Sequence, residues 1–247
     1  MEVLMLDINK IHLGDAYKLI KLLPNKSIDL IVTDPPYDLK LKPNAKITNN
    51  LSKNLVARDK ELIGAKIVSG IKLEILDEFI RVLKTINCYI WCNKAQIIPY
   101  LDFFVKKHNC KFEILIWFKT NPVPAFNNNY LTDKEYCLYF RKNAYCKPQT
   151  YHDGKSVFFE PTNITDKNLF SHPTIKPLKF IKTMISNSSK QGDIVLDPFI
   201  GSGTTAVAAA QLNRQYIGFE HNEKYYNIAI NRLNGINANG QTSFLLR

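Results

Sequence analysis

The stretch 194–220, IVLDPFIGSGTTAVAAAQLNRQYIGFE, constrains the fold more than any other part of the chain. An apolar segment leads into a glycine-containing turn, then an alanine-rich segment typical of a helix, then a second apolar segment. The turn places Gly201, Gly203 and Ala206 in a G-x-G-x-x-A spacing, in which small residues let a ligand approach the backbone closely. We predict a strand–helix–strand unit of an open α/β sheet, with a nucleoside-containing ligand at the turn.

The charges around this turn indicate which cofactor it binds. Glu220 ends the second apolar segment and is placed to accept hydrogen bonds from ribose hydroxyls. Asp197 directly precedes the turn, and no lysine or arginine lies between Lys190 and Arg214. A carboxylate repels a pyrophosphate but attracts a sulfonium or ammonium group. We therefore expect S-adenosylmethionine rather than NAD, with a ligand-free βα turn as the alternative interpretation.

A second motif follows the apolar segment 28–33. Asp34, Pro35, Pro36 and Tyr37 come directly after it, and two consecutive prolines cannot continue a strand. They predict a stiff turn at the carboxyl end of a strand, where α/β sheets bind ligands. The Asp34 carboxylate and the Pro35 carbonyl offer two acceptors for an amino group, and Tyr37 offers a ring on which a base can stack. The alternative is a proline-capped strand end with no such role.

Short apolar runs alternate with helical patterns along the chain, as in α/β proteins. Strands are predicted at Lys10–Leu13, Ile28–Thr33, Cys88–Cys92, Phe112–Phe118, Glu135–Arg141, Ile194–Leu196 and Gln215–Phe219. Helices are predicted at Ala16–Leu23, Ile71–Lys84, Ala95–His108, Pro177–Ser186, Thr204–Leu212 and Glu223–Leu233. No helix separates the fourth and fifth strands, so we expect that pair to be antiparallel. The fold class is α/β, a single domain over 1–247 with a seven-stranded, mostly parallel sheet and one antiparallel strand.

The net charge indicates a polyanionic partner. The chain has 33 Lys and Arg against 22 Asp and Glu, a formal charge of +11. Nucleic acid is the simplest polyanion, and a basic surface that serves solubility alone is the alternative. The sequence has no apolar run long enough to span a membrane, and its five cysteines have no C-x-x-C spacing. We expect no membrane contact, no metal site and a cytoplasmic location.

Several motifs, in their order along the chain, resemble those of one family. The Asp34–Tyr37 motif, DPPY, resembles the catalytic motif of the DNA methyltransferases that modify exocyclic amino groups. DPFIGSG at 197–203 is similar to their cofactor motif, and HPTIKP at 172–177 resembles a further cofactor-side motif. WFKTNP at 117–122 is similar to the motif that flanks the target-base pocket. The catalytic motif precedes the cofactor motif, an order similar to the β group of the family.

The resemblance implies a circularly permuted, Rossmann-like methyltransferase fold. It assigns the catalytic role to Asp34, Pro35, Pro36 and Tyr37. It assigns cofactor binding to Asp15, Ala16, His172, Lys176, Asp197, Phe199, Gly201, Ser202, Gly203, Thr204, Thr205 and Glu220. It also implies double-stranded DNA as substrate, a homodimer, and a companion restriction enzyme.

The predicted activity is transfer of a methyl group from S-adenosylmethionine to N6 of an adenine flipped out of DNA. N4-cytosine methylation is the nearest alternative, because both bases present an amino group; in the family, Asp at the first motif position favours adenine. A nicotinamide-dependent dehydrogenase shares the glycine spacing but leaves the Pro-Pro turn unexplained. A DNA-binding module without activity is a third alternative.

Two long stretches lack periodicity. Asp38–Ser69 is rich in lysine, and Lys142–Phe170 is polar with scattered aromatic side chains. Loops of this length inside a compact domain are usually functional or mobile. We expect a mobile loop at about 38–69 and a target-recognition insertion at about 142–170, with a solvated loop as the alternative.

Overall fold

The computed structural model describes residues 6–39, 44, 50–64, 70–124, 130–162, 169–170 and 175–236. Its strands are β1 (Lys10–Leu13), β2 (Leu30–Thr33), β3 (Ile86–Cys92), β4 (Lys111–Lys119), β5 (Lys134–Lys142), β6 (Val157–Glu160), β7 (Ile194–Asp197) and β8 (Gln215–Glu220). Its helices are α1 (Ala16–Leu19) with the turn η1 (Ile20–Leu22), α2 (Asn50–Gly64), α3 (Ile75–Val82), α4 (Lys94–Leu101) with the π-helical segment η2 (Asp102–Lys107), α6 (Leu178–Ser188), α7 (Thr204–Gln211) and α8 (Glu223–Leu233).

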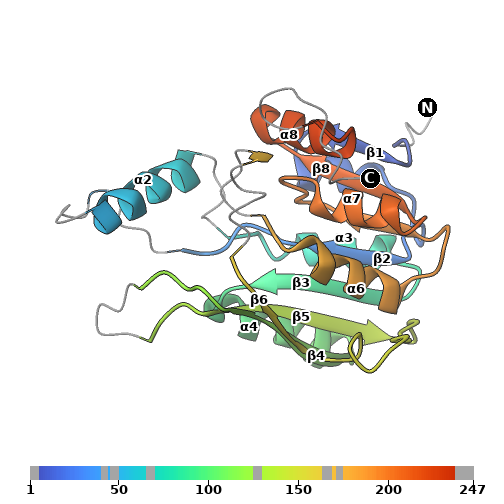
Figure 1. The fold of residues 1–247 in the computed structure, drawn as a ribbon. Coiled ribbons are helices and arrows are strands. Elements are labelled where there is room, and N and C mark those ends of the chain that lie inside the picture. Colours follow the sequence, from blue (N-terminus) through green and yellow to red (C-terminus); the bar gives the residue numbers. More distant parts are fainter. Residues whose placement is uncertain are drawn as a thin grey trace.

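The described strands form one sheet in the order β1-β8-β7-β2-β3-β5-β4-β6 (Figure 1). β5 is antiparallel to both of its neighbours, and the other pairings are parallel. The prediction of an α/β sheet with one reversed strand is therefore confirmed. All seven predicted strands are present, with ends within two residues of the expected ones.

The predicted strand number was wrong, because the sheet has eight strands. The additional strand, β6, lies within the stretch 142–170 and pairs in parallel with the edge strand β4. Its four residues alternate between exposed and half-buried, and Phe158 stacks on Phe180 with ring centroids 3.5 Å apart. A four-residue edge strand buried on one face leaves little hydrophobic pattern in the sequence.

The stretch 38–69, which we expected to be a loop, contains the 15-residue helix α2. In Figure 1 this helix lies beside the sheet rather than over it. Among its described side chains Val56, Asp59 and Leu62 are buried. The sequence of α2, NLSKNLVARDKELIG, mixes a few apolar residues with many polar ones, which is a weak helical signal and explains why the helix was missed.

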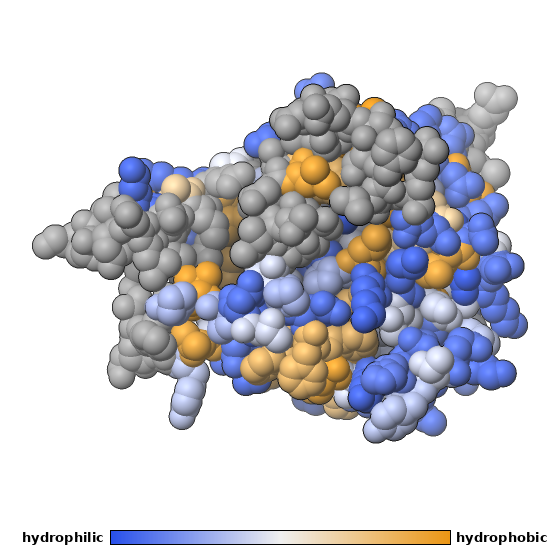
Figure 2. Space-filling view, in the orientation of Figure 1, coloured by the Kyte–Doolittle hydropathy of each residue, from blue (hydrophilic) through white to orange (hydrophobic). Residues whose placement is uncertain are grey.

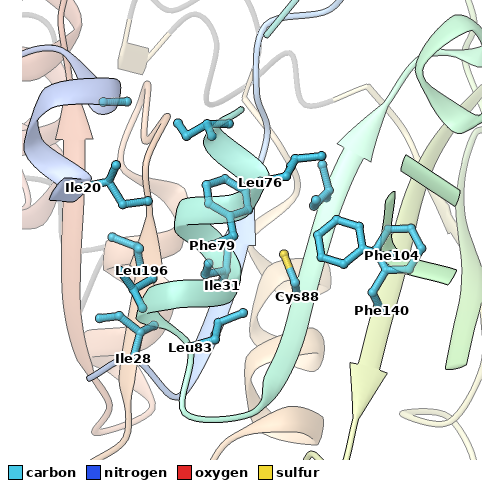
Figure 3. Packing of buried hydrophobic residues seen from close by; sticks show 14 of the residues in the cluster. Ile20, Ile28, Ile31, Leu76, Phe79, Leu83, Cys88, Phe104, Phe140 and Leu196 are labelled. Carbon is cyan, nitrogen blue, oxygen red and sulfur yellow. The ribbon is translucent and has the colours of Figure 1, made fainter. Parts of the chain in front are cut away.

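Helices cover both faces of the sheet, so the apolar runs of β2, β3 and β7 are buried on both sides. On one face α1, α3 and α4 pack in a cluster that includes Phe79 and Phe104 (Figure 3). The Phe104 ring stacks on Phe140 of β5 at 4.3 Å between centroids. On the other face α6 and α7 pack around Trp91 and Phe180. This double layer fixes the strand ends that carry the site.

The face shown in Figure 2 is mostly hydrophilic, with a hydrophobic patch over the β4–β6 edge. Phe159 of β6 is 67% exposed, and its ring centroid lies 5.4 Å from that of Phe118 of β4.

Across the part of the chain that the structure describes, no helix has the length and apolar character of a membrane span. In the same residues no three His, Cys, Asp or Glu side chains are grouped as a metal site would need.

Candidate active site

One pocket of about 680 Å³ opens at the carboxyl ends of the parallel strands. This is within the range of about 300–1,000 Å³ typical of small-molecule sites. Its wall includes both sequence motifs, the DPPY turn after β2 and the glycine turn after β7. Because β5 is reversed, its first residues, including Glu135, lie at the same edge as Trp117 of β4. The pocket therefore collects side chains from seven separate parts of the chain: Asp15, Asp34, Trp91, Lys119, Glu135, Lys176 and Glu220.

The glycine turn packs closely against α8. Gly203 precedes α7 in the left-handed region, with φ of 81°, and an added Cβ would lie 3.0 Å from Ala229 Cβ and 3.2 Å from Ala229 Cα. On the neighbouring strand β8, a Cβ on Gly218 would lie 2.2 Å from Ile200 Cδ1. A side chain at Gly203 would therefore strain the backbone and press on α8, while the neighbouring Gly201 and Ser202 line the pocket.

Glu220 lies at the end of β8 and lines the pocket. Its Oε2 accepts a hydrogen bond from the Gly201 amide at 3.0 Å, and its Oε1 accepts one from the Asn222 amide at 2.8 Å. Burial raises the pKa of this carboxyl, and the two amides oppose the rise. The carboxylate is thus held against the turn, at the wall of the pocket.

Asp15 and Ala16 line the same end of the pocket. Asp15 caps α1 by accepting a hydrogen bond from the Tyr17 amide at 2.7 Å. The Tyr17 ring meets Phe199 edge to face, with centroids 6.3 Å apart, and its hydroxyl accepts from the Lys72 amide at 2.9 Å. The sequence analysis missed Tyr17, although a tyrosine two residues after a capping Asp is a position it could have weighed.

Asp197 joins the two motifs directly. Its Oδ1 accepts from the Thr33 hydroxyl at 2.8 Å and from the Phe199 amide at 3.1 Å, and its Oδ2 accepts from the Thr205 hydroxyl at 2.7 Å. Since Thr33 immediately precedes Asp34, the catalytic turn is tied to the glycine turn by one side chain. Burial raises the pKa of Asp197 to about 7, against the lowering effect of these hydrogen bonds.

This raised pKa makes a testable prediction about stability. Between the ordinary pKa of about 3.9 and about 7, the folded protein holds a proton on Asp197 that the unfolded chain has released, so wild-type stability falls as pH rises through this window. Asp197→Asn has no such proton. Thermal unfolding from pH 4 to 8 should show the melting temperature of Asp197→Asn gaining on wild type as pH rises, whereas Asp77→Asn, at an exposed ion pair with Lys107, should stay parallel. Parallel curves for Asp197→Asn would contradict the assignment.

Ser202, Thr204 and Thr205 of the turn line the pocket, and their hydroxyl groups are hydrogen-bonded to other side chains of the protein. Arg232 of α8 is 1% exposed and donates to the Thr204 hydroxyl at 2.6 Å and to the Ser202 hydroxyl at 3.2 Å. Its guanidinium lies 5.2 Å from the Phe170 ring centroid. Ser202, Thr204 and Thr205 therefore brace the turn, and Arg232 is a supporting residue that its position near the end of a helix did not reveal.

The DPPY turn is fixed by α4 and by the segment before α3. Gln96 donates to the Pro36 carbonyl at 3.1 Å, and the Gly70 amide donates to the Tyr37 carbonyl at 3.3 Å. Among the described residues, no hydrogen bond ends on the Pro35 carbonyl. Asp34 Oδ1 and the Tyr37 hydroxyl are buried without a hydrogen bond of ordinary geometry to another described residue. Asp34 and Tyr37 affect each other's pKa through their side chains, and both line the pocket, where they could also bind a polar ligand.

Lys176 lies against the DPPY turn. Its ammonium contacts the carboxylate of Asp34 and lies 3.2 Å from Glu135 Oε2, and it lines the same pocket as the glycine turn. His172 lies outside the described residues. Lys119 binds the other oxygen of Glu135 at 2.7 Å. Glu135 was missed because no motif marks it; its place follows from the reversal of β5.

The residues at the glycine end fit S-adenosylmethionine. Three carboxylates, from Asp15, Asp197 and Glu220, lie along this part of the wall, and the β7–α7 turn contributes no lysine or arginine to it. Such surroundings favour a positively charged sulfonium over a pyrophosphate. Gly201 of the turn lines the pocket and has no side chain, so a nucleoside can approach the backbone closely there.

Comparison with known proteins shows the family to which the chain belongs. The profile of the DNA methylase family matches residues 28–231. The chain is 31% identical to the Type II methyltransferase M.HinfI of Haemophilus influenzae, over 94% of this chain and 70% of that protein. It is also 31% identical to the Type II methyltransferase M2.DpnII of Streptococcus pneumoniae, over 91% of this chain and 89% of that protein.

Solved structures share the architecture. The crystal structure of the M1.HpyAVI–SAM complex superposes with a TM-score of 0.63 at 26% identity, covering 91% of this chain and 99% of that one. The cytosine-N4-specific PvuII DNA methyltransferase gives a TM-score of 0.66 at 19% identity, over 92% and 86%, and shows the fold alone. The chain belongs to the DNA methylase family. It is a DNA methyltransferase whose cofactor is S-adenosylmethionine.

Proposed function

We propose that the chain methylates N6 of an adenine flipped out of double-stranded DNA. One observation carries this proposal: Asp34 and the Pro35 carbonyl lie in the same pocket as the glycine turn, and Thr33 and Asp197 hold the two motifs together at 2.8 Å. An amino group bound at Asp34 is thereby placed beside the cofactor. Type II relatives at 31% identity support DNA as the substrate.

The proposed mechanism depends on positioning. The target base leaves the duplex at a cost of a few kcal/mol. Asp34 and the Pro35 carbonyl each accept a hydrogen bond from one N–H of the amino group. The lone pair of the nitrogen therefore points away from them into the pocket. Tyr37 and the tryptophans of β3 and β4 offer flat walls for the base. S-adenosylmethionine supplies the methyl group on a cationic sulfur. Because the amino nitrogen is held in line with the methyl group, the transfer needs no covalent intermediate between the base and the protein.

Cytosine N4 is the competing target, because its amino group satisfies the same two acceptors. The resemblance of the motif, with Asp34 at its first position, favours adenine. To test this, the chain is expressed in a host free of DNA methylation, and modified bases are mapped across the genome and identified by mass spectrometry. N6-methyladenine at one recurring sequence is expected; N4-methylcytosine alone would overturn the choice of base.

We further propose that 142–170 recognises the target sequence, helped by 38–69. Tyr151 is 83% exposed and Phe159 is 67% exposed in the first stretch, and aromatic side chains at a surface are suited to base contacts. Lysines in both stretches are suited to phosphates. The +11 charge then acts mainly through the DNA backbone.

Binding to DNA should weaken steeply with salt, because each neutralised phosphate releases a counterion. With about six phosphate contacts, affinity should fall by about 10³-fold between 50 and 200 mM salt. Fluorescence anisotropy with a labelled duplex measures this. A flat response would contradict a backbone-driven interface.

We propose that the protein acts in the cytoplasm, because its proposed substrate is chromosomal DNA. A homodimer and a cognate restriction enzyme are proposed as partners, and the Type II class of the relatives supports the second. Sedimentation of the purified chain tests the first, and restriction of unmodified DNA in cell extracts tests the second.

A further inference from the structure

Four charges alternate along the catalytic end of the pocket: Asp34, Lys176, Glu135 and Lys119. Lys176 contacts Asp34 and lies 3.2 Å from Glu135 Oε2, and Lys119 lies 2.7 Å from Glu135 Oε1. The side chain of Lys176 is 9% exposed, that of Lys119 15% and that of Glu135 21%. Charged side chains that are buried to this extent depend on one another, because removing one of them leaves another buried without a partner of opposite charge.

The Lys176 ammonium is confined on its other sides by aromatic rings. It lies 4.9 Å from the centroid of Trp91 and 5.6 Å from that of Tyr37. Cation–π attraction holds an ammonium at these distances. The two rings and Glu135 together hold the Lys176 ammonium next to Asp34.

The charge state of Asp34 decides whether it can work. Burial raises the pKa of this carboxyl and the nearby Glu135 raises it further, whereas Lys176 lowers it. A protonated carboxyl would turn one acceptor into a donor, and a donor cannot bind an amino hydrogen. Lys176 is therefore the charged group that opposes loss of the acceptor, and the Tyr37 side chain lowers the pKa of Asp34 to a smaller extent.

Neighbours on the other packed elements do not replace Lys176. Burial raises the pKa of the Tyr37 hydroxyl well above its ordinary value and that of the Cys92 thiol of β3 to about 12. Burial also raises the pKa of the Cys137 thiol of β5. All three stay neutral near pH 7, and Asp197 of β7, whose pKa burial raises to about 7, supplies no positive charge. Among the described residues, Lys176 is the cation in contact with Asp34.

From this arrangement we propose that Lys176 is a positioning residue for methyl transfer. It holds Asp34 in place as a charged acceptor for the target amino group, and Glu135 anchors it there. The proposal rests on the proposed function, and it departs from the cofactor-binding role that the resemblance implied for Lys176. Lys176 acts through Asp34 and touches neither the methyl group nor the base in this scheme.

The experiment measures the pH dependence of single-turnover methylation for wild type, Lys176→Gln, Lys176→Arg and Lys119→Met. An adjacent cation lowers the pKa of an Asp by roughly 1–3 units, so the acidic limb of Lys176→Gln should move to higher pH by about that amount. Lys176→Arg keeps the charge and should restore the wild-type limb. Lys119→Met removes a lysine of the same cluster that is one carboxylate further from Asp34, and should move the limb less.

Isothermal titration with S-adenosylmethionine accompanies each profile and shows that the variants fold. Lys176→Gln should bind the cofactor within about threefold of wild type, because the ion pairs of Lys176 are with Asp34 and Glu135 and not with the carboxylates at the glycine turn. An unmoved acidic limb, a limb that moves equally in Lys119→Met, or a large loss of cofactor affinity would overturn the proposal. Failure of the proposed function looks different, because wild type itself would then not methylate adenine.

Discussion

Replacing Asp34 by Ala is expected to lower the rate of methyl transfer by about 10²–10³-fold, the usual cost of removing one positioned polar group from a reacting centre. That corresponds to about 3–4 kcal/mol of transition-state stabilisation. The reason is geometric: the Pro35 carbonyl alone cannot turn the amino lone pair toward the glycine turn. Single-turnover assays with saturating cofactor and DNA measure the change.

The control is Asp38→Ala. Asp38 is exposed, lies four residues further along, and does not line the pocket. It should methylate at about the wild-type rate. Asp34→Ala also leaves Lys176 with Glu135 as its remaining carboxylate, so cofactor titration is needed to show that the pocket survives. A folded, cofactor-binding Asp34→Ala that methylated normally would refute the mechanism.

Replacing Gly203 by Ala should both destabilise the protein and weaken cofactor binding. A side chain in the left-handed region costs about 1–2 kcal/mol. The new Cβ would lie 3.2 Å from Ala229 Cα, and such overpacking costs about 1–3 kcal/mol more. Relief of that contact must displace the turn, so we expect cofactor affinity to fall by about tenfold or more, equivalent to about 1.4 kcal/mol.

Gly192→Ala is a matched control for this variant. Gly192 has φ of 82°, against 81° for Gly203. An added Cβ at Gly192 meets nothing within 4 Å. It should therefore show the conformational cost alone and leave cofactor affinity unchanged. Equal effects of the two variants on thermal unfolding and on titration would mean that the contact with Ala229 is unimportant.

Local patterns predicted most of the sheet. β1, β7 and β8 are short apolar runs next to unmistakable turns, and the absence of a helix between β4 and β5 was enough to predict the reversed strand. β6 and α2 escaped because an edge strand and a lightly buried helix bury too few side chains to leave a period in the sequence. The motif residues Asp34, Asp197 and Glu220 were found because a stiff turn or a glycine spacing marks each of them.

The sequence by itself was sufficient to predict the two turns that form the candidate site, the DPPY turn and the glycine turn. Pro35 and Pro36 stop a strand wherever they occur, and Gly203 permits a backbone conformation that other residues resist. These are properties of the local chain and need no partner. They were sufficient to predict an amino-group acceptor and a cofactor turn.

The tertiary structure alone decided how the charges between those ends are arranged. Lys176 comes from the segment before α6, Glu135 from the reversed strand β5 and Lys119 from β4, and they meet because the order of strands brings their ends to one edge. Electrostatic pairing depends on distance and burial in space, and no spacing along the chain encodes either. This is why the contact between Lys176 and Asp34 could not be predicted from the sequence.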